Sequence, residues 1–112
     1  MARTIGTVTV VGLGLIGSSI ARAVMARLPD VTVTGHDASA GVRAEARALG
    51  LCHRIADDPA DAVMGADLVI LAVPVGRMAD AARVCAPGLK PDAIMSDVGS
   101  SRSGVGAALR AA

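Results

Sequence analysis

A glycine-rich turn near the amino terminus constrains the fold of this chain more than any other feature. The sequence G-L-G-L-I-G at residues 12–17 follows a β-branched run and precedes a segment whose apolar residues recur with helical spacing. At such a junction each glycine has a task. Gly12 permits the tight turn, Gly14 lets a pyrophosphate approach the backbone, and Gly17 lets the helix pack closely on the strand. The motif predicts the start of a dinucleotide-binding fold.

Strand and helix patterns alternate along the rest of the sequence. We expect strands at residues 7–11, 31–37, 67–73 and 93–97, and helices at 15–28, 40–49 and 77–85. We also expect a short strand within 52–55, a short helix at 59–64, a turn at 87–88 and the start of a helix at 101–112. This alternation predicts an α/β fold, a Rossmann-like doubly wound parallel sheet, in one domain over residues 1–112. Because a complete dinucleotide fold has a second half, we expect this one to be truncated.

Asp37 lies 20 residues after Gly17, at the end of the second predicted strand. A carboxylate there can accept hydrogen bonds from both adenosine ribose hydroxyls, which favours NAD, and it would repel the 2′-phosphate of NADP. Arg43 is the nearest cation that could offset this repulsion. Leu15 and Ile16 begin the helix whose amide groups would face the pyrophosphate. We therefore predict that NAD is the cofactor and that NADP is less favoured.

Composition and charge exclude several other classes of protein. The 112 residues include 11 basic and 10 acidic side chains and no Phe, Tyr or Trp, so the sequence has neither the basic patch nor the stacking residues of a nucleic-acid-binding protein. The uncharged run from residue 5 to 21 is broken by glycines and followed by Arg22, which does not fit a membrane span. We expect a cytoplasmic protein that binds neither nucleic acid nor membrane.

The cysteines and histidines show no pattern typical of a metal site or a catalytic triad. Cys52 and Cys85 lie 33 residues apart without a C-x-x-C motif, so we interpret them as buried or unreactive thiols and expect no metal. His36 and His53 lack a nucleophile or carboxylate at recognisable spacing, so we interpret both as structural. The residues after the later strands, 72–75 and 96–100, fit either ligand contacts or simple strand ends.

Three segments together resemble one enzyme family. Residues 12–19, the I-L-A-V-P-V sequence at 70–75 and the S-D-V-G-S sequence at 96–100 are similar to the amino-terminal NAD-binding region of the prephenate/arogenate dehydrogenases of tyrosine biosynthesis. The resemblance implies oxidative decarboxylation of prephenate or arogenate with NAD as hydride acceptor. It implies that Val73 and Pro74 form a wall beside the dinucleotide. It also implies that Ser100 hydrogen-bonds with the family's catalytic histidine, while Arg102 replaces the lysine of the motif.

The resemblance also limits what this chain can do by itself. The family's histidine follows the serine motif at some distance, and the helical domain that binds substrate and forms the homodimer comes later still, so we expect a nucleotide-binding part without catalysis of its own. Two alternatives stay open. The chain could belong to another dehydrogenase or reductase, of the 3-hydroxyacid dehydrogenase or pyrroline-carboxylate reductase type, although the D-V-G-S sequence at 97–100 argues against both. It could also be a non-catalytic nucleotide-sensing module.

Overall fold

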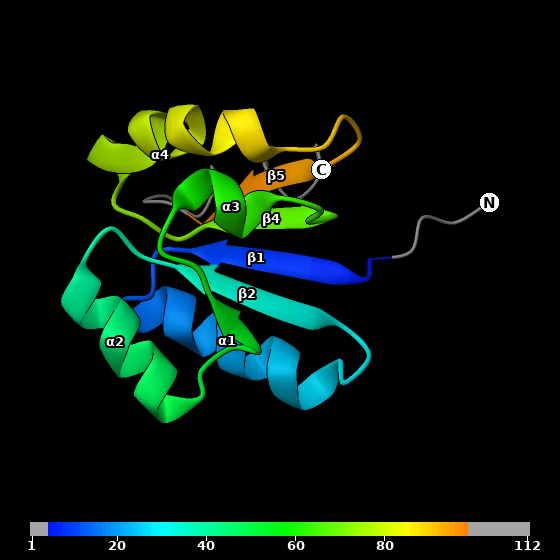
Figure 1. The fold of residues 1–112 in the computed structure, drawn as a ribbon, viewed down its shortest axis with the longest axis vertical. Helices are drawn as coiled ribbons and strands as arrows, with labels where there is room; N and C mark the ends of the chain where they lie inside the picture. Colours follow the sequence, from blue (N-terminus) through cyan, green and yellow to red (C-terminus); the bar gives the residue numbers. More distant parts are fainter. Residues whose placement is uncertain (1–4, 99–112) are drawn as a thin grey trace.

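Five parallel strands form one sheet in the order β3-β2-β1-β4-β5, in a computed structural model that describes residues 5–98 (Figure 1). The strands are β1 (Thr7–Val11), β2 (Thr32–His36), β3 (Arg54–Ile55), β4 (Leu68–Leu71) and β5 (Ile94–Asp97). The helices are α1 (Leu15–Arg27), α2 (Ala40–Leu49), α3 (Pro59–Val63) and α4 (Met78–Cys85), with two 3₁₀ turns, η1 (Val75–Arg77) and η2 (Ala86–Gly88).

The strand order reverses at β1, which confirms the predicted doubly wound fold. The chain runs outward from β1 to β2 and β3, then crosses back to build β4 and β5 on the other side of β1. Val11 pairs with His36 of β2 and with Leu71 of β4, so these three strands end level with one another. In open α/β sheets, ligands bind at the carboxyl ends of the strands where the order reverses.

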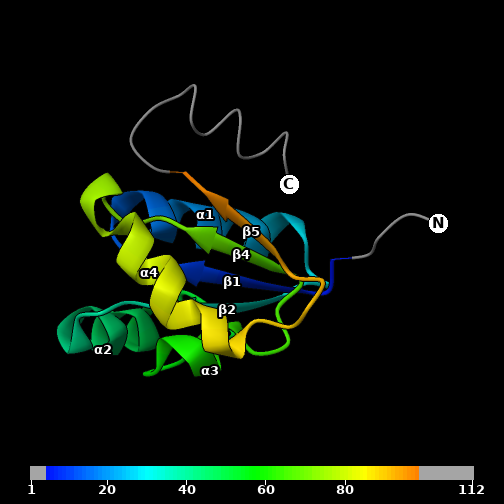
Figure 2. The same ribbon diagram turned by 90° about the horizontal axis from the view of Figure 1, so that it is seen from above.

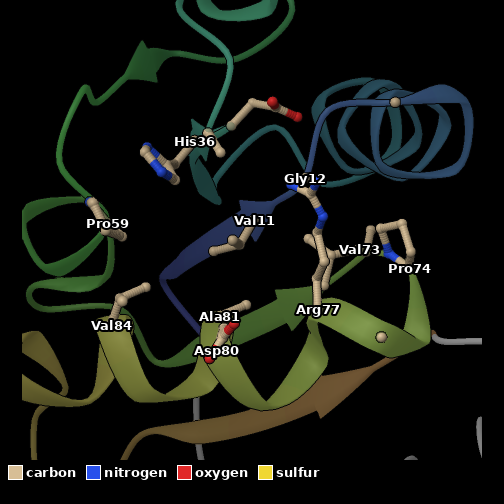
Figure 3. Close-up of a pocket in the computed structure, with 15 residues that line it drawn as sticks. Val11, Gly12, His36, Pro59, Val73, Pro74, Arg77, Asp80, Ala81 and Val84 are labelled. Atoms are coloured by element: carbon tan, nitrogen blue, oxygen red, sulfur yellow. The ribbon is translucent and has the colours of Figure 1, made fainter.

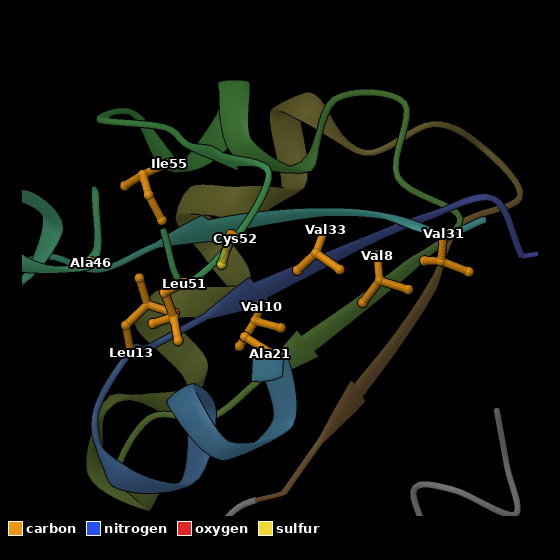
Figure 4. Close-up of a cluster of buried hydrophobic side chains, with 10 residues drawn as sticks. All are labelled: Val8, Val10, Leu13, Ala21, Val31, Val33, Ala46, Leu51, Cys52 and Ile55. Atoms are coloured by element: carbon orange, nitrogen blue, oxygen red, sulfur yellow. The ribbon is translucent and has the colours of Figure 1, made fainter. Parts of the chain in front are cut away.

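Small aliphatic side chains let the helices sit close to both faces of the sheet. α1 lies on one face, and α3 and α4 lie on the other (Figure 2). On the α1 face, Val10, Val33 and Ala21 are fully buried in a cluster to which α2 also contributes (Figure 4). On the other face, Val69 and Cys85 are fully buried in a second cluster beneath α4. Burial of this apolar surface is the main favourable term that holds the layers together.

Side-chain capping explains where two of the four α-helices within residues 5–98, α2 and α3, begin. The Ser39 side chain accepts a hydrogen bond from the amide of Val42 at the start of α2, and Gly50 ends that helix in the left-handed conformation, with φ of 61°. The Asp58 side chain accepts from the amide of Asp61 at the start of α3. α1 differs, because Gly14 is its N-cap and supplies no side-chain hydrogen bond. Its first amides are therefore not capped by a side chain of their own turn.

The elements predicted within residues 5–98 are all found, and the strands other than β1 are shorter than expected. The second strand spans 32–36 instead of 31–37, and the third long strand spans 68–71 instead of 67–73. Asp37, Ala72 and Val73 consequently lie just beyond strand ends. The predicted helix at 77–85 begins at Met78 after a 3₁₀ turn. The helix expected at 101–112 lies outside the described residues.

At the other end of the sheet, where the strands begin, one carboxylate makes contacts with several segments. Asp67 accepts hydrogen bonds from the amides of Gly6, at 2.7 Å, and Thr7, at 3.0 Å, and it forms an ion pair with Lys90. The Lys90 ammonium and these two amides lower the pKa of Asp67 to about 2. Asp67 thus ties the segments that lead into β1, β4 and β5 at the end of the sheet farthest from the strand ends described above.

Both cysteines are buried in the described structure as free thiols. Burial raises the pKa of Cys52 to about 11, and burial together with the nearby Asp58 charge raises the pKa of Cys85. Thiols with raised pKa values are poor nucleophiles, so both side chains act as small apolar residues of the core. Within residues 5–98, none of the helices is both long and apolar enough to cross a membrane.

Candidate functional site: a cleft at the carboxyl ends of the strands

A cleft of about 770 Å³ opens where β1, β2 and β4 end (Figure 3). The glycine loop forms one side, and the start of α4 forms the side opposite to it. The end of β2 and the residues after β4 complete its walls. The lining residues are Val11, Gly12, Gly14, His36, Asp37, Ala38, Pro59, Ala72, Val73, Pro74, Gly76, Arg77, Asp80, Ala81 and Val84.

Two of the three glycines in the loop cannot be replaced without a clash, because a Cβ atom at either position would overlap a neighbouring backbone carbonyl. Gly12 has φ of +100°, and a Cβ atom there would lie 2.5 Å from the carbonyl oxygen of Ala72. A Cβ atom on Gly17 would lie 1.7 Å from the carbonyl oxygen of Gly12. The Gly12 amide also donates a 2.7 Å hydrogen bond to the carbonyl of His36, which ties the loop to the end of β2. The loop is therefore held in one place against both β2 and β4.

Gly14 is the glycine that leaves space for a ligand. A Cβ atom built on it would meet nothing within 4 Å, and its φ of −74° does not require glycine. The uncapped amino end of α1 begins at the next residue. Leu15 and Ile16 are 87% and 57% exposed, and their side chains do not line the cleft, so any ligand contact they make here is through their backbone amides. Free amides and the positive end of a 13-residue helix dipole suit a phosphate group.

Asp37 joins the glycine loop to the turn after β2. Its Oδ2 accepts a 2.8 Å hydrogen bond from the amide of Leu13, and its Oδ1 accepts a 2.9 Å hydrogen bond from the amide of Ser39. Each carboxylate oxygen can accept a further hydrogen bond. The side chain is half-buried and lines the cleft, so acceptor positions remain for a vicinal diol such as a ribose. This arrangement fits the adenosine ribose of a dinucleotide.

Arg43 lies behind the same turn and not in the cleft. Its Nη1 donates to the carbonyls of Asp37 and Ala38, at 2.7 and 3.2 Å, and its Nε donates to Asp57 at 3.0 Å. Asp57 also binds Arg47, and hydrogen bonds from Arg47 and Arg43 lower the pKa of Asp57. The Arg43 side chain is only 16% exposed. In this conformation Arg43 supports the backbone of the turn and does not present its charge to a 2′-phosphate.

The residues after β4 form the wall next to the glycine loop. Val73 and Pro74, which the family resemblance assigns to a wall beside the dinucleotide, both line the cleft. The carbonyl of Pro74 accepts a hydrogen bond from the amide of Arg77 at 2.8 Å, which closes the 3₁₀ turn before α4. A Cβ on Gly12 would also contact the Val73 side chain at 2.9 Å, so this wall and the glycine loop are in direct contact.

Arg77 and His36 are polar lining residues that the sequence analysis did not predict as site residues. Arg77 extends from the start of α4 toward the glycine loop (Figure 3). Its side chain is exposed and makes no ion pair or side-chain hydrogen bond with another residue in 5–98. A sequence signal existed for Arg77, because it follows the predicted strand end at 72–75 in the turn that leads into a helix. His36 was interpreted as structural, although it is adjacent to Asp37 at a strand end.

Several other predicted features do not enter the described cleft. Ser100 and Arg102 lie outside the described residues, so the structure places neither of them. His53 accepts a hydrogen bond from the amide of Val33 and does not line the cleft. Among residues 5–98, there is no group of three His, Cys, Asp or Glu side chains that could hold a metal ion.

Comparison with known proteins agrees with this geometry. The chain matches the family described as prephenate dehydrogenase, nucleotide-binding domain, over residues 20–112. It is 52% identical over 98 residues to a cyclohexadienyl dehydrogenase of Zymomonas mobilis subsp. mobilis, a match that covers 88% of this chain and 33% of that protein. The chain thus spans about a third of the length of this curated relative.

Solved structures show the same fold. The crystal structure of prephenate dehydrogenase from A. aeolicus in complex with hydroxyphenyl propionate and NAD⁺ superposes with a TM-score of 0.77 at 24% identity, over 89% of this chain and 35% of that one. The Synechocystis arogenate dehydrogenase superposes with a TM-score of 0.75 at 27% identity, over 82% of this chain and 32% of that one. With a family match over most of its length, this chain belongs to the prephenate dehydrogenase family, as a nucleotide-binding domain of that family.

Proposed function

We propose that this domain binds NAD in the cleft at the ends of β1, β2 and β4. The observation that carries the proposal is the juxtaposition of an open Gly14, an uncapped helix terminus and the Asp37 carboxylate at the point where strand order reverses. The pyrophosphate would lie on the first amides of α1, and the adenosine ribose would lie on Asp37. Support also comes from the A. aeolicus enzyme, which was crystallised with NAD⁺ and has the same fold.

We further propose that the domain serves a dehydrogenase for prephenate or arogenate. When bound, NAD⁺ would supply the hydride acceptor for oxidation of the substrate ring, which with loss of carbon dioxide would give an aromatic product. In this proposal, residues of the chain bind and orient the dinucleotide, and Val73 and Pro74 bound the cleft beside it. Ser100 is proposed to orient the family's catalytic histidine. The names of the family and of the Zymomonas and Synechocystis relatives support this substrate class.

The proposal extends to the setting of the enzyme. We place the enzyme in the cytoplasm, because its two buried cysteines are unpaired and thiols usually stay reduced in that compartment. We propose that its partners are a small-molecule substrate and a second copy of the protein, through a helical domain of the kind found in the family. Sedimentation of the complete polypeptide tests the second partner, because a monomeric mass would contradict it.

Two titrations and one assay test this function. Isothermal titration of the chain should show saturable binding of NAD⁺ at one site and binding of NADP⁺ that is about 10-fold or more weaker, because Asp37 repels the 2′-phosphate. Failure to bind NAD⁺ would contradict the cofactor assignment. The complete polypeptide that carries this domain should form NADH with prephenate or arogenate, and formation with neither would contradict the substrate class.

A further inference from the structure

His36, the last residue of β2, places an imidazole ring in the wall of the cleft beside Asp37. The residue is 6% exposed, and its Nδ1 lies 2.9 Å from the carbonyl oxygen of Ala56. A carbonyl oxygen can only accept a hydrogen bond, so Nδ1 carries the proton of this contact. In the neutral ring, Nε2 is then an acceptor with a free lone pair.

Nothing within residues 5–98 donates a hydrogen bond to this Nε2. Among the described residues, Nε2 of His36 does not belong to the fully buried unpaired side-chain atoms, so it is accessible from the cleft, where water or a ligand can donate to it. The ring points from β2 toward Pro59, and both residues line the cleft (Figure 3). A ligand in the cleft that presents a hydrogen-bond donor at this wall would therefore satisfy Nε2.

The surroundings of His36 narrow the chemistry of that ligand. Pro59, Ala81 and Val84 give this part of the cleft apolar walls, and Asp37 lies next to it on β2's carboxyl end. If Asp37 holds the ribose, the attached base enters the part of the cleft beyond the carboxylate. A flat base with apolar faces and one donor on its edge fits this place. Among purines, the exocyclic amine of adenine is such a donor, whereas hypoxanthine carries a carbonyl oxygen at the same position.

We propose that His36 is a specificity-determining residue that accepts a hydrogen bond from the 6-amino group of adenine. The inference rests on the proposed binding of NAD in this cleft. It adds that the domain distinguishes the base of the dinucleotide as well as its ribose. A carbonyl in place of the amine would face the Nε2 lone pair, and neither oxygen nor nitrogen could donate to the other.

Binding of NAD⁺ and of nicotinamide hypoxanthine dinucleotide, measured by titration calorimetry, tests this assignment. The wild-type protein should bind the hypoxanthine analogue about 5-fold or more weakly than NAD⁺, because one hydrogen bond is lost and two acceptors face each other. In His36→Asn, the amide nitrogen takes the place of Nδ1 and can still donate to Ala56, but no atom takes the place of Nε2. This variant should bind the two dinucleotides within about 2-fold of each other.

Two further variants separate recognition from folding. His36→Gln brings an amide oxygen near the place of Nε2 and should recover part of the preference for NAD⁺. His53→Asn removes the histidine that lies outside the cleft and should leave the preference unchanged.

The outcomes distinguish this inference from the function on which it rests. No binding of NAD⁺ to the folded wild-type protein would overturn both. Equal wild-type affinity for the two dinucleotides, or a wild-type preference retained in His36→Asn, would overturn the role of His36 alone.

Discussion

At the level of single residues, Asp37 connects the structure of the loop to the choice of cofactor. Its two carboxylate oxygens accept hydrogen bonds from the amides of Leu13 and Ser39, and the same side chain lines the cleft. One residue thus positions the glycine loop and presents negative charge to the ligand. The sequence predicted the position of this carboxylate at a strand end, but not its two backbone contacts, which depend on how the turn after β2 folds.

Replacing Asp37 should change the discrimination between the two dinucleotides. Asp37→Asn keeps the size and one oxygen of the side chain but removes its charge. A unit charge close to a 2′-phosphate costs about 1–4 kcal/mol, depending on the effective dielectric. We therefore expect NAD⁺ to bind more weakly and the NAD⁺ to NADP⁺ affinity ratio to fall by about 5-fold or more. Titration calorimetry measures both affinities, and an unchanged ratio would refute the ribose assignment.

Arg77 should contribute charge to phosphate binding. Its exposed guanidinium extends toward the glycine loop and has no partner side chain within the described residues (Figure 3). Arg77→Ala should weaken NAD⁺ binding by about 2- to 10-fold and reduce the dependence of the affinity on salt, because an exposed ionic contact is modest and screened. Arg27→Ala, in the last turn of α1 and away from the cleft, is the matched control. Equal effects of both variants would argue against a specific contact.

At the level of secondary structure, the glycines of the loop divide into packing and ligand-approach positions. Gly17→Ala forces a Cβ to within 1.7 Å of the Gly12 carbonyl, so α1 must move away from β1. Overpacking of this kind costs about 1–3 kcal/mol, which would lower Tm by about 5–20 °C for a domain of this size. Gly14→Ala adds its Cβ to open space and should melt close to wild type.

The measurement of NAD⁺ affinity should show a defect in Gly14→Ala, the variant whose stability is close to wild type. Gly14→Ala should lose about 10-fold or more in NAD⁺ affinity, because the new methyl group occupies the space where a pyrophosphate would approach the backbone. Thermal melts combined with titrations check both halves of this prediction. Normal NAD⁺ binding by Gly14→Ala, or wild-type stability of Gly17→Ala, would contradict the roles we assign.

The elements that could be predicted from the sequence are those whose signals are local. The β-branched run of β1, the apolar run of β4 and the glycine turn between β1 and α1 each determine their own conformation, so their placement was confirmed. Exact strand ends depend on pairing with neighbours, and β3 has only two residues. The sequence placed Arg77 after a predicted strand end and His36 beside Asp37, but the orientation of their side chains toward the cleft follows from how α4 and α3 pack over the carboxyl ends of the strands.

At the level of the whole molecule, the two ends of the sheet have different tasks. The carboxyl ends of the strands form the cleft, while the amino ends are joined by Asp67, Lys90 and the amides of Gly6 and Thr7. The contacts of Asp67 join segments about 60 residues apart in the sequence, from the start of β1 to the start of β4. This division predicts that stability and ligand binding can be altered separately.

Asp67 should make the free energy of unfolding depend on pH in the acid range. Its pKa is lowered to about 2 in the folded chain, below the value of about 3.9 of an unfolded aspartate. The folded state therefore gains stability from the ionised carboxylate above about pH 4, and this gain is lost as pH falls toward 2. Asp67→Asn should be less stable than wild type at neutral pH, with a smaller loss between pH 4 and pH 2.

Denaturant melts at several pH values measure this effect. Asp30→Asn, in the exposed turn after α1, is the matched control and should follow the wild-type profile. NAD⁺ affinity at neutral pH should be unchanged in folded Asp67→Asn, since the residue is at the other end of the sheet. A wild-type acid profile in Asp67→Asn would show that its three contacts add nothing to folding.

The most direct test of the central claim is an NMR titration of the ¹⁵N-labelled chain with NAD⁺. We predict that the backbone amides of Gly12, Gly14, Asp37 and Arg77 shift together and saturate with a single Kd. The chemical shifts of the backbone amides around Asp67 should not change. No shift at up to about 1 mM NAD⁺, a concentration that reveals even weak binding, would contradict the account, as would shifts confined to the Asp67 end of the sheet.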